Sequence, residues 1–327
     1  MKMKIDVFSV LLFFIAFVSL NAESISHNDD IQKVKIELGH RLFYDADLSI
    51  NGTFSCATCH EQKRAFSDGN STHPGVFADP AKRNVPSLAN VGEFKNLNWA
   101  DNSLKSLSEQ SLIPIKGTDP IEMGMDGYED EIRKRLSANK CYQKLFKIAF
   151  KHENGAINLD TVSQALEGFE KTLISKNSLY DKSLKSAETL LSKDAVDGEK
   201  LYFGTAKCNS CHSAPLFSDD SFHQVQFRDK FLNKRVEDFG LFDVTGDEKD
   251  RYFFRTPSLR NVSLTAPYWH DGSVKTLKGA ILNHNLEINQ QLNNKDIKKI
   301  VAFLETLTDY SFVNNPKYGQ ANIECRY

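Results

Sequence analysis

The chain has 327 residues, of which 26% are charged and 40% hydrophobic, and its 41 basic and 43 acidic side chains leave a formal net charge of −2. This near balance implies no basic surface for binding to nucleic acid or to an anionic membrane. The length is sufficient for two domains of ordinary size.

Residues 1–22 have the layout of a secretory signal peptide. Lys2 and Lys4 precede an almost unbroken apolar run over 8–20, and a small-residue cleavage point follows at Ala22. The run is too short and wrongly flanked for a stable membrane span, although an uncleaved N-terminal anchor is the alternative. No second apolar run in the sequence is long enough to cross a bilayer. We therefore expect a mature protein outside the cytoplasm, without stable membrane insertion.

Apolar residues spaced three to four apart predict that most of the chain is helical. The pattern covers residues 33–43, 128–150, 159–174 and 195–203. No run alternates well enough to predict a β-sheet. The polar segment 175–194, rich in Ser and Lys, is the best candidate for a domain boundary. We therefore expect an N-terminal domain over 23–180 and a C-terminal domain over 181–327.

The pentapeptide Cys-x-x-Cys-His occurs twice. Its residues are Cys56, Cys59 and His60 in the first copy, and Cys208, Cys211 and His212 in the second. This is the attachment signature of c-type haem, in which two thiols bond to the porphyrin and the His supplies an axial iron ligand. A thiol redox pair or half of a zinc site does not require the trailing His. Two copies in an exported chain predict two covalent haem c groups, and haem attachment outside the cytoplasm makes the periplasm the expected location.

Two further cysteines, Cys141 and Cys325, lie outside these motifs. In an oxidising compartment they could form a disulfide. The sequence does not give their separation in space, so two free buried thiols are an equal alternative.

The two halves of the chain share more than the haem motifs. The stretches 99–112 and 269–282 match at a constant offset of 170 residues. The identical pairs are Trp99 and Trp269, Asp101 and Asp271, Ser103 and Ser273, Lys105 and Lys275, Leu107 and Leu277, and Leu112 and Leu282. Six identities at one offset predict a mostly α-helical fold of two cytochrome c-like haem domains related by internal duplication.

The same offset pairs Pro114 with His284. A His can ligate iron, whereas a Pro has no side-chain donor. We therefore predict that the first haem, held by His60, keeps an open sixth position where small molecules react. The second haem, held by His212 and His284, should be six-coordinate and suited to electron transfer. Taken alone, His284 would more often be a surface histidine.

Several motifs carry a family resemblance. They are Arg83-Asn84-x-Pro86-Ser87-Leu88, Gln110-x-x-x-Pro114, Glu122-Met123-Gly124 and Leu264-Thr265-Ala266-Pro267-Tyr268-Trp269-His270-Asp271-Gly272. With the haem motifs, they resemble the bacterial di-haem cytochrome c peroxidase superfamily, which includes the MauG-type protein-oxidising enzymes, over nearly the whole mature chain. The region around Trp99 is most similar to a MauG-like branch encoded beside copper-binding partner proteins, some of them associated with methanobactin systems.

The resemblance implies roles for single residues. Glu122 matches the distal carboxylate that moves a proton while the peroxide O–O bond breaks. Gln110 and Pro114 match residues that line the same pocket. Trp99 matches the tryptophan between the haems that relays an electron. The alternatives are a solvated loop acid for Glu122 and an ordinary core tryptophan for Trp99.

The resemblance also implies a calcium ion between the domains. Its ligands would be Asn84 and the backbone carbonyls of Thr265 and Pro267, because hard oxygen donors suit that ion.

Two positions depart from the usual family pattern. Typical cytochrome c peroxidases have Met at the place of His284, and the methylamine dehydrogenase maturation enzyme has Tyr. A His ligand should give a lower haem potential than Met. Many members also have a His in the loop after the first haem motif, which blocks that haem until the other is reduced. His73 lies in this loop at an unusual spacing, so a blocking ligand and an exposed loop residue are both open.

These features favour an enzyme that uses hydrogen peroxide to oxidise a protein partner, at a Trp or Tyr, through a high-valent di-haem state. A small copper-binding protein is the expected partner. The alternative is a cytochrome c peroxidase that reduces peroxide to water with electrons from a small cytochrome c or a cupredoxin. A third hypothesis is a non-catalytic di-haem electron carrier, which would have two six-coordinate irons.

Overall fold

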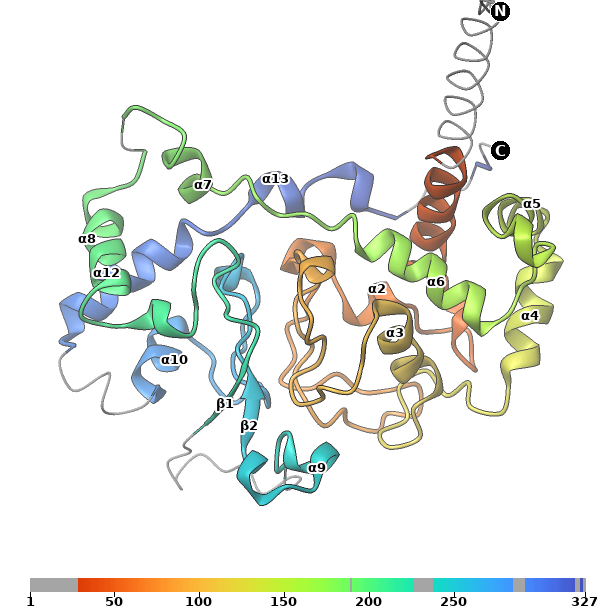
Figure 1. The fold of residues 1–327 in the computed structure, drawn as a ribbon, viewed down its shortest axis with the longest axis horizontal. Helices are drawn as coiled ribbons and strands as arrows, with labels where there is room; N and C mark the ends of the chain where they lie inside the picture. The colour runs from red at the N-terminus through yellow and green to blue at the C-terminus, as the bar shows by residue number, and fades with distance from the viewer. Residues whose placement is uncertain (1–28, 189, 226–237, 285–291, 321–323, 326–327) are drawn as a thin grey trace, which may run out of the picture.

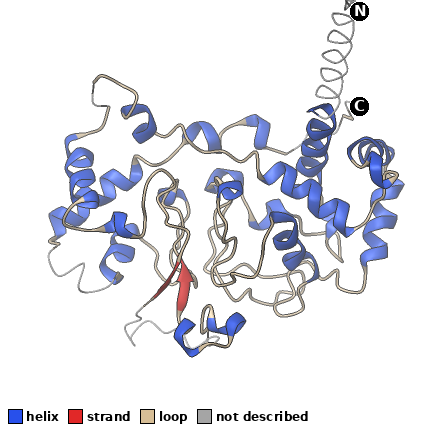
Figure 2. Ribbon diagram, viewed as in Figure 1, coloured by secondary structure: helices blue, strands red, loops and turns tan. Residues whose placement is uncertain are grey.

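A computed structural model describes residues 29–188, 190–225, 238–284, 292–320 and 324–325. The chain is mostly helical, as the sequence predicts (Figure 2). The helices are residues 29–43, α2 (Cys56–Cys59), α3 (Leu107–Lys116), α4 (Glu129–Ala138), α5 (Lys140–Ala149), α6 (Leu159–Glu170), α7 (Leu179–Ser183), α8 (Lys193–Phe203), α9 (Phe242–Thr245), α10 (Leu277–Asn283), α12 (Asn294–Glu305) and α13 (Tyr310–Val313). The predicted signal peptide, 1–22, lies outside the described residues. Among those described, no helix has the length and apolar character that a membrane span needs.

Two features of the secondary structure were not predicted from the sequence. The helical pattern over 128–150 forms two helices, because the side chain of Asn139 caps α5 by accepting a bond from the backbone N–H of Cys141. Two short strands are also present, β1 (Phe222–Gln224) and β2 (Phe253–Arg255), which pair antiparallel. Three residues are too few for alternation to be detected, so this pairing depends on tertiary contact.

Each half of the molecule contains a close crossing of two helices. In the first half, helix 29–43 crosses α6 at Gly39, where an added Cβ would lie 1.8 Å from the carbonyl oxygen of Ala165. In the second half, α8 crosses α12 at Gly198, where a Cβ would lie 1.9 Å from the carbonyl oxygen of Lys299. Only glycine permits such an approach. The α8–α12 pair lies at one end of the molecule, and helix 29–43 with α6 lies towards the other (Figure 1).

A second feature recurs at Asn90 and Asn261, which both have left-handed backbone conformations, with φ of 59° and 61°. The backbone N–H of each donates to a leucine carbonyl, and the side-chain oxygen of each accepts a backbone N–H two residues beyond that leucine. The partners are Leu173 and Ser175 for Asn90, and Leu307 and Asp309 for Asn261. The repeated geometry supports the predicted duplication.

The buried apolar residues form two cores, one in each half of the chain. The first core extends from Val34 to Leu173, and the second from Tyr180 to Leu307. Residues 312–318 return to the first core, where Phe312 packs against Phe66 with ring centroids 5.6 Å apart. The C-terminal end of the chain therefore contributes to the core of the first half, and the predicted domains, 23–180 and 181–327, stay a prediction.

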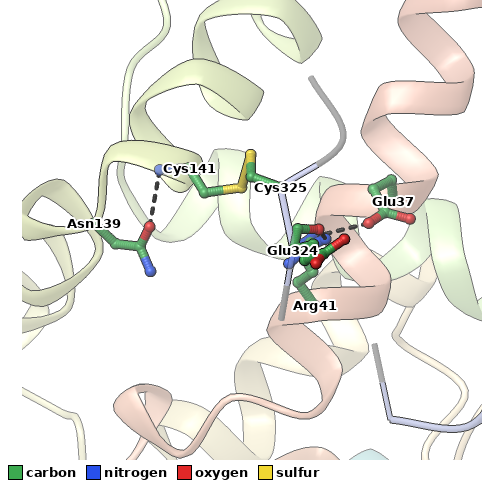
Figure 3. Close-up of a disulfide and its surroundings, with 6 residues drawn as sticks. All are labelled: Glu37, Arg41, Asn139, Cys141, Glu324 and Cys325. Atoms are coloured by element: carbon green, nitrogen blue, oxygen red, sulfur yellow. Dashed lines mark hydrogen bonds and ion pairs between the residues drawn. A yellow bond between two sulfur atoms is a disulfide. The ribbon is translucent and has the colours of Figure 1, made fainter. Parts of the chain in front are cut away.

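A disulfide between Cys141 and Cys325 holds the returning tail, with a Cα–Cα distance of 5.7 Å (Figure 3). The alternative of two free thiols is therefore wrong. Arg41 also binds the tail, because its guanidinium donates to the carbonyl oxygen of Glu324 at 2.8 Å while forming an ion pair with Glu37 at 2.9 Å. The tail is thus attached to α5 and to helix 29–43.

The two halves meet through reciprocal backbone hydrogen bonds. The N–H of Asn84 donates to the carbonyl of His270 at 2.6 Å, and the N–H of Arg255 donates to the carbonyl of Trp99 at 2.7 Å. Nearby, Arg83 forms two 2.8 Å hydrogen bonds with the carboxylate of Asp238. Such bidentate pairs are geometrically specific, so they orient one half relative to the other.

Removal of the disulfide should destabilise the protein. We expect Cys141→Ser to lower the free energy of unfolding by about 2–5 kcal/mol, because the bond closes a long loop in the unfolded chain. Thermal unfolding checks this, with Cys325→Ser as the matched variant. A reductant should lower the melting temperature of the natural protein and leave both variants unchanged. Equal melting temperatures for all three proteins would contradict the expectation.

Candidate haem sites and peroxide pocket

In the first haem motif, His60 has the tautomer and the neutral form that metal binding requires. The Nδ1 of His60 lies 2.7 Å from the carbonyl oxygen of Phe66. A carbonyl only accepts, so Nδ1 carries the proton and Nε2 keeps a free lone pair. Burial lowers the pKa of His60 to about 4, so its imidazole is neutral near pH 7, which is the form that ligates iron.

The second motif repeats this arrangement. The Nδ1 of His212 lies 3.1 Å from the carbonyl oxygen of Pro257 and 3.3 Å from that of Phe217. Burial, followed by the charge of His284, lowers the pKa of His212 to about 4. Phe66 and Phe217 both have positive φ values, of 61° and 54°, an uncommon conformation that occurs at the carbonyls facing the two imidazoles. The thiols available for attachment are Cys56, Cys59, Cys208 and Cys211, all partly buried and free of disulfides.

The structure brings His284 opposite His212. The ring centroids of the two imidazoles are 6.2 Å apart. A metal–imidazole bond of about 2 Å on each side, with the distance from nitrogen to ring centre added, gives roughly this separation. Both histidines, Cys208 and Cys211 line one cavity of about 440 Å³. These donors therefore fit a haem with iron between the two imidazoles, which supports the predicted ligand role of His284.

Two buried donors face the same cavity without a hydrogen-bond partner among the described residues. They are Nη1 of Arg255 and Nε1 of Trp269. Burial lowers the pKa of Arg255, and the carboxylate of Asp220, 3.8 Å away, works against that shift. A haem carries carboxylate side chains that such donors can bind, so the orphaned groups also fit the cofactor. Sequence reasoning missed this role of Arg255. The sequence signal that could have indicated it is the repeat, in which Arg255 occupies the position that Asn84 has in the first half.

On the first half, the structure brings the predicted peroxide-pocket residues together. Gln110 and Pro114 lie one turn apart on α3, which places them on the same helix face. The carbonyl of Pro114 accepts a 3.0 Å bond from the N–H of Met123, so the loop that carries Glu122 packs against that helix. The three predicted residues therefore belong to one local unit, although their roles remain predictions.

Glu122 lies close to the first haem motif. Burial raises its pKa, and the charge of His73 partly offsets the effect. In turn, burial raises the pKa of the Cys59 thiol to about 12, with the charge of Glu122 as a further cause. Glu122 is therefore not a solvated loop acid. It is a partly desolvated carboxyl near the cysteine that anchors the first haem.

His73 lies in the same neighbourhood. Its loop bonds to the Glu122 loop through the N–H of Val76, which donates to the carbonyl of Glu122 at 2.8 Å. The ring of His73 lies edge-on to Phe54 at 5.7 Å, and its charge also lowers the pKa of His60. A blocking ligand and a loop residue both remain open for His73.

Trp99 lies where the halves meet. Its indole N–H donates to the carbonyl of Asn84 at 2.8 Å, and its ring lines the cavity of the second haem motif. This placement supports the predicted position between the haems. Asn84 Nδ2 donates to backbone carbonyls at Asn70 and Ser71, which leaves its side-chain oxygen to accept. Asn84, Thr265 and Pro267 line the same cavity, and the calcium ion stays a prediction.

Comparison with known proteins agrees with this geometry. Residues 33–189 match the family model of the di-haem cytochrome c peroxidases. The chain is 33% identical to the cytochrome c551 peroxidase of Nitrosomonas europaea over 292 residues, which cover 86% of this chain and 84% of that protein. It is also 33% identical to the methylamine utilization protein MauG of Methylorubrum extorquens over 301 residues, or 87% and 82% of the two chains.

Solved structures show the same likeness. A MauG-like protein associated with microbial copper homeostasis superposes with a TM-score of 0.82 and 36% identity, covering 88% of this chain and 93% of that one. The chain belongs to the di-haem cytochrome c peroxidase and MauG family. It is therefore a haem oxidoreductase that acts on peroxide and carries two haem c groups, and the hypothesis of a non-catalytic carrier is set aside.

The second haem site provides a direct test. We expect His284→Ala to convert the low-spin signal of that haem to a high-spin one, because the iron loses its second nitrogen ligand. Electron paramagnetic resonance of the ferric protein measures this. His223, which also lines the cavity, supplies the matched control, and His223→Ala should leave the signal unchanged. An unaltered low-spin signal in His284→Ala would show that the ligand assignment is wrong.

Proposed function

We propose that this periplasmic enzyme uses hydrogen peroxide to oxidise a protein partner. The observation that carries the proposal is the difference between the halves at one equivalent position. His284 faces His212 with ring centroids 6.2 Å apart, whereas the first half has Pro114 there. One site is therefore open to a small molecule, and the other is closed by two imidazoles.

A His rather than a Met at position 284 favours an enzyme that oxidises a protein partner over one that takes electrons from a soluble cytochrome. An axial Met raises haem potential, which helps a haem accept electrons from such a donor. Two imidazoles lower that potential and stabilise the oxidised iron. A site of this kind is suited to sharing oxidising equivalents with the reactive site.

When bound, the first haem supplies an iron that binds peroxide and accepts its oxidising equivalents. The protein supplies the proton transfer. The carboxylate of Glu122 takes the proton from the inner peroxide oxygen and delivers it to the outer oxygen, which leaves as water. The side-chain amide of Gln110, on the same face of α3 as Pro114, orients the peroxide by hydrogen bonding. Pro114 contributes no donor that could compete for the iron.

The route for electrons passes through the contact between the halves. Trp99 is an oxidisable ring at this contact, and its N–H is held by the carbonyl of Asn84. The reciprocal backbone bonds fix its position relative to both halves. Electrons from a partner can therefore reach the first site without the partner entering the peroxide pocket.

We infer that the partner is a small exported copper-binding protein, oxidised at a Trp or Tyr. This rests on the likeness to the MauG-like protein associated with copper homeostasis, at 36% identity and a TM-score of 0.82. Long-range electron transfer requires an aromatic side chain near the contact surface rather than a substrate pocket.

A cytochrome c peroxidase that turns peroxide into water is the second candidate. The position of His73 favours it, because the charge of this residue acts on both His60 and Glu122. If His73 binds the first iron, the enzyme needs prior reduction by a small cytochrome c or cupredoxin before it can react.

One experiment separates these candidates. We expect one equivalent of hydrogen peroxide, added to the fully ferric protein without reductant, to convert it rapidly to a long-lived oxidised species. Stopped-flow absorption in the Soret region measures this. His73→Ala should react at the same rate. A reaction that requires prior reduction in the natural protein, but not in His73→Ala, would replace the proposal with the cytochrome c peroxidase.

The proton-transfer role of Glu122 has its own test. We expect Glu122→Gln to slow the reaction with peroxide by about 10²–10⁴-fold. In the natural protein the rate should rise with pH, because the ionised carboxylate is the active form. Its inflection should lie above the usual glutamate range, since burial raises the pKa of Glu122.

Stopped-flow rates at several pH values check both points. Asp126, exposed on the same loop, is the control, and Asp126→Asn should keep the rate and the profile. A Glu122→Gln variant with the natural pH profile would contradict the assignment.

A further inference from the structure

Glu170, the last residue of α6, is a buried acid with no place in the chemistry described above. Its side chain is 5% exposed, and Oε2 has no hydrogen-bond partner within the described part of the chain. Burial, followed by the negative charge of Glu167, raises the pKa of Glu170 to about 8. Buried carboxyl oxygens are normally hydrogen-bonded, so one without a partner needs an explanation.

The second half of the molecule contains a segment equivalent to the one that carries Glu170. Residues 169–173 read Phe-Glu-Lys-Thr-Leu, and residues 303–307 read Phe-Leu-Glu-Thr-Leu. The local geometry agrees, because the hydroxyl of Thr172 donates to the carbonyl of Phe169 at 2.7 Å and that of Thr306 donates to the carbonyl of Phe303 at 2.6 Å.

Leu304 therefore occupies the place of Glu170 in the second half, and it is 4% exposed. Packing at this position in the fold is therefore satisfied by an apolar side chain. The acid is thus a departure confined to the half whose haem is expected to react with peroxide.

The end of α6 packs close to the first haem motif. Cys56 packs against the same buried core as Phe169, the neighbour of Glu170. The ring of Phe43 lies 5.2 Å from that of Phe169 and 6.5 Å from that of His60. The charge of Glu170 also contributes, after burial, to the raised pKa of the Cys56 thiol. Cys56 bonds to the edge of the haem whose iron His60 holds. A negative charge in a poorly solvated interior stabilises a nearby iron that has lost an electron.

The other titratable groups around Glu170 do not neutralise it. Glu167, on α6, forms an ion pair with Lys171 and accepts a bond from the N–H of Ser108. On helix 29–43, the ring of His40 stacks on Phe169 at 4.7 Å, and its Nε2 is bonded to the carbonyl of Gly319. On α2, the Cys56 thiol is used for haem attachment.

We propose that Glu170 is a proton-coupled charge partner of the first haem. It stays protonated while the iron is reduced. When the iron gives an electron to the oxidant, the carboxyl releases its proton to solvent, and the new carboxylate balances the added positive charge. This inference depends on the haem at Cys56 and not on the proposed oxidation of a protein partner.

A redox titration of that haem at several pH values tests the proposal. Ionised Glu170 favours oxidised iron, so the reduction potential should fall as pH rises through the window between the pKa values of the two redox states. The expected slope is about 59 mV per pH unit, which is a tenfold change in a one-electron equilibrium. Electron paramagnetic resonance separates the two haems by spin state.

Two variants and one control make the result decisive. Glu170→Leu copies the second half, and Glu170→Gln keeps the polarity without the proton. Both should abolish the slope and raise the potential at high pH, while circular dichroism shows an unchanged fold. Glu167→Gln should keep the slope, because the titrating carboxyl is still present. A flat natural profile, or a slope that survives in either Glu170 variant, would overturn the proposal. Peroxide reactivity is measured separately, so a failure here leaves the proposed function standing.

Discussion

The hydrogen bond between a proximal imidazole and a backbone carbonyl is the constraint on which the rest of the structure depends. It fixes the tautomer of His60 and His212, and so decides which nitrogen meets the iron. The carbonyls belong to loops with unusual backbone angles, as at Phe66 and Phe217. Those loops are held by the crossing helices, because Phe66 packs against Phe43 of helix 29–43. In the second half, Phe217 packs against Tyr202 of α8 and Phe303 of α12.

The molecule uses one scaffold twice and changes it at a few positions. His284 faces His212 in the second half, whereas the matching position in the first half is Pro114, which has no side-chain donor. Asn84 places a side-chain oxygen on one side of the contact between the halves, and Arg255 places a buried guanidinium on the other. These differences are chemical rather than architectural, because the surrounding bonds, such as those of the two asparagine turns, are the same.

The contact between the halves connects the two candidate haem sites. Its reciprocal bonds hold Trp99 in place, and the Arg83–Asp238 pair adds orientation. The returning tail adds a second connection, because residues near the C-terminal end pack in the N-terminal core and the disulfide holds the tail there. The C-terminal end of the chain is thus fixed to the N-terminal half.

The sequence by itself determined the haem attachment residues, the helical class and the inequivalence of Pro114 and His284, because these depend on local motifs and on a repeat visible at constant spacing. It did not determine the pairing of Cys141 with Cys325, the short β1–β2 ladder or the return of residues 312–318 to the first core. It also missed Arg255 and Glu170 as functional candidates. All of these depend on which distant segments meet and on which polar groups lose water when they do. The burial of a side chain and the identity of its bonding partners are properties of the folded chain, so only the tertiary structure decided them.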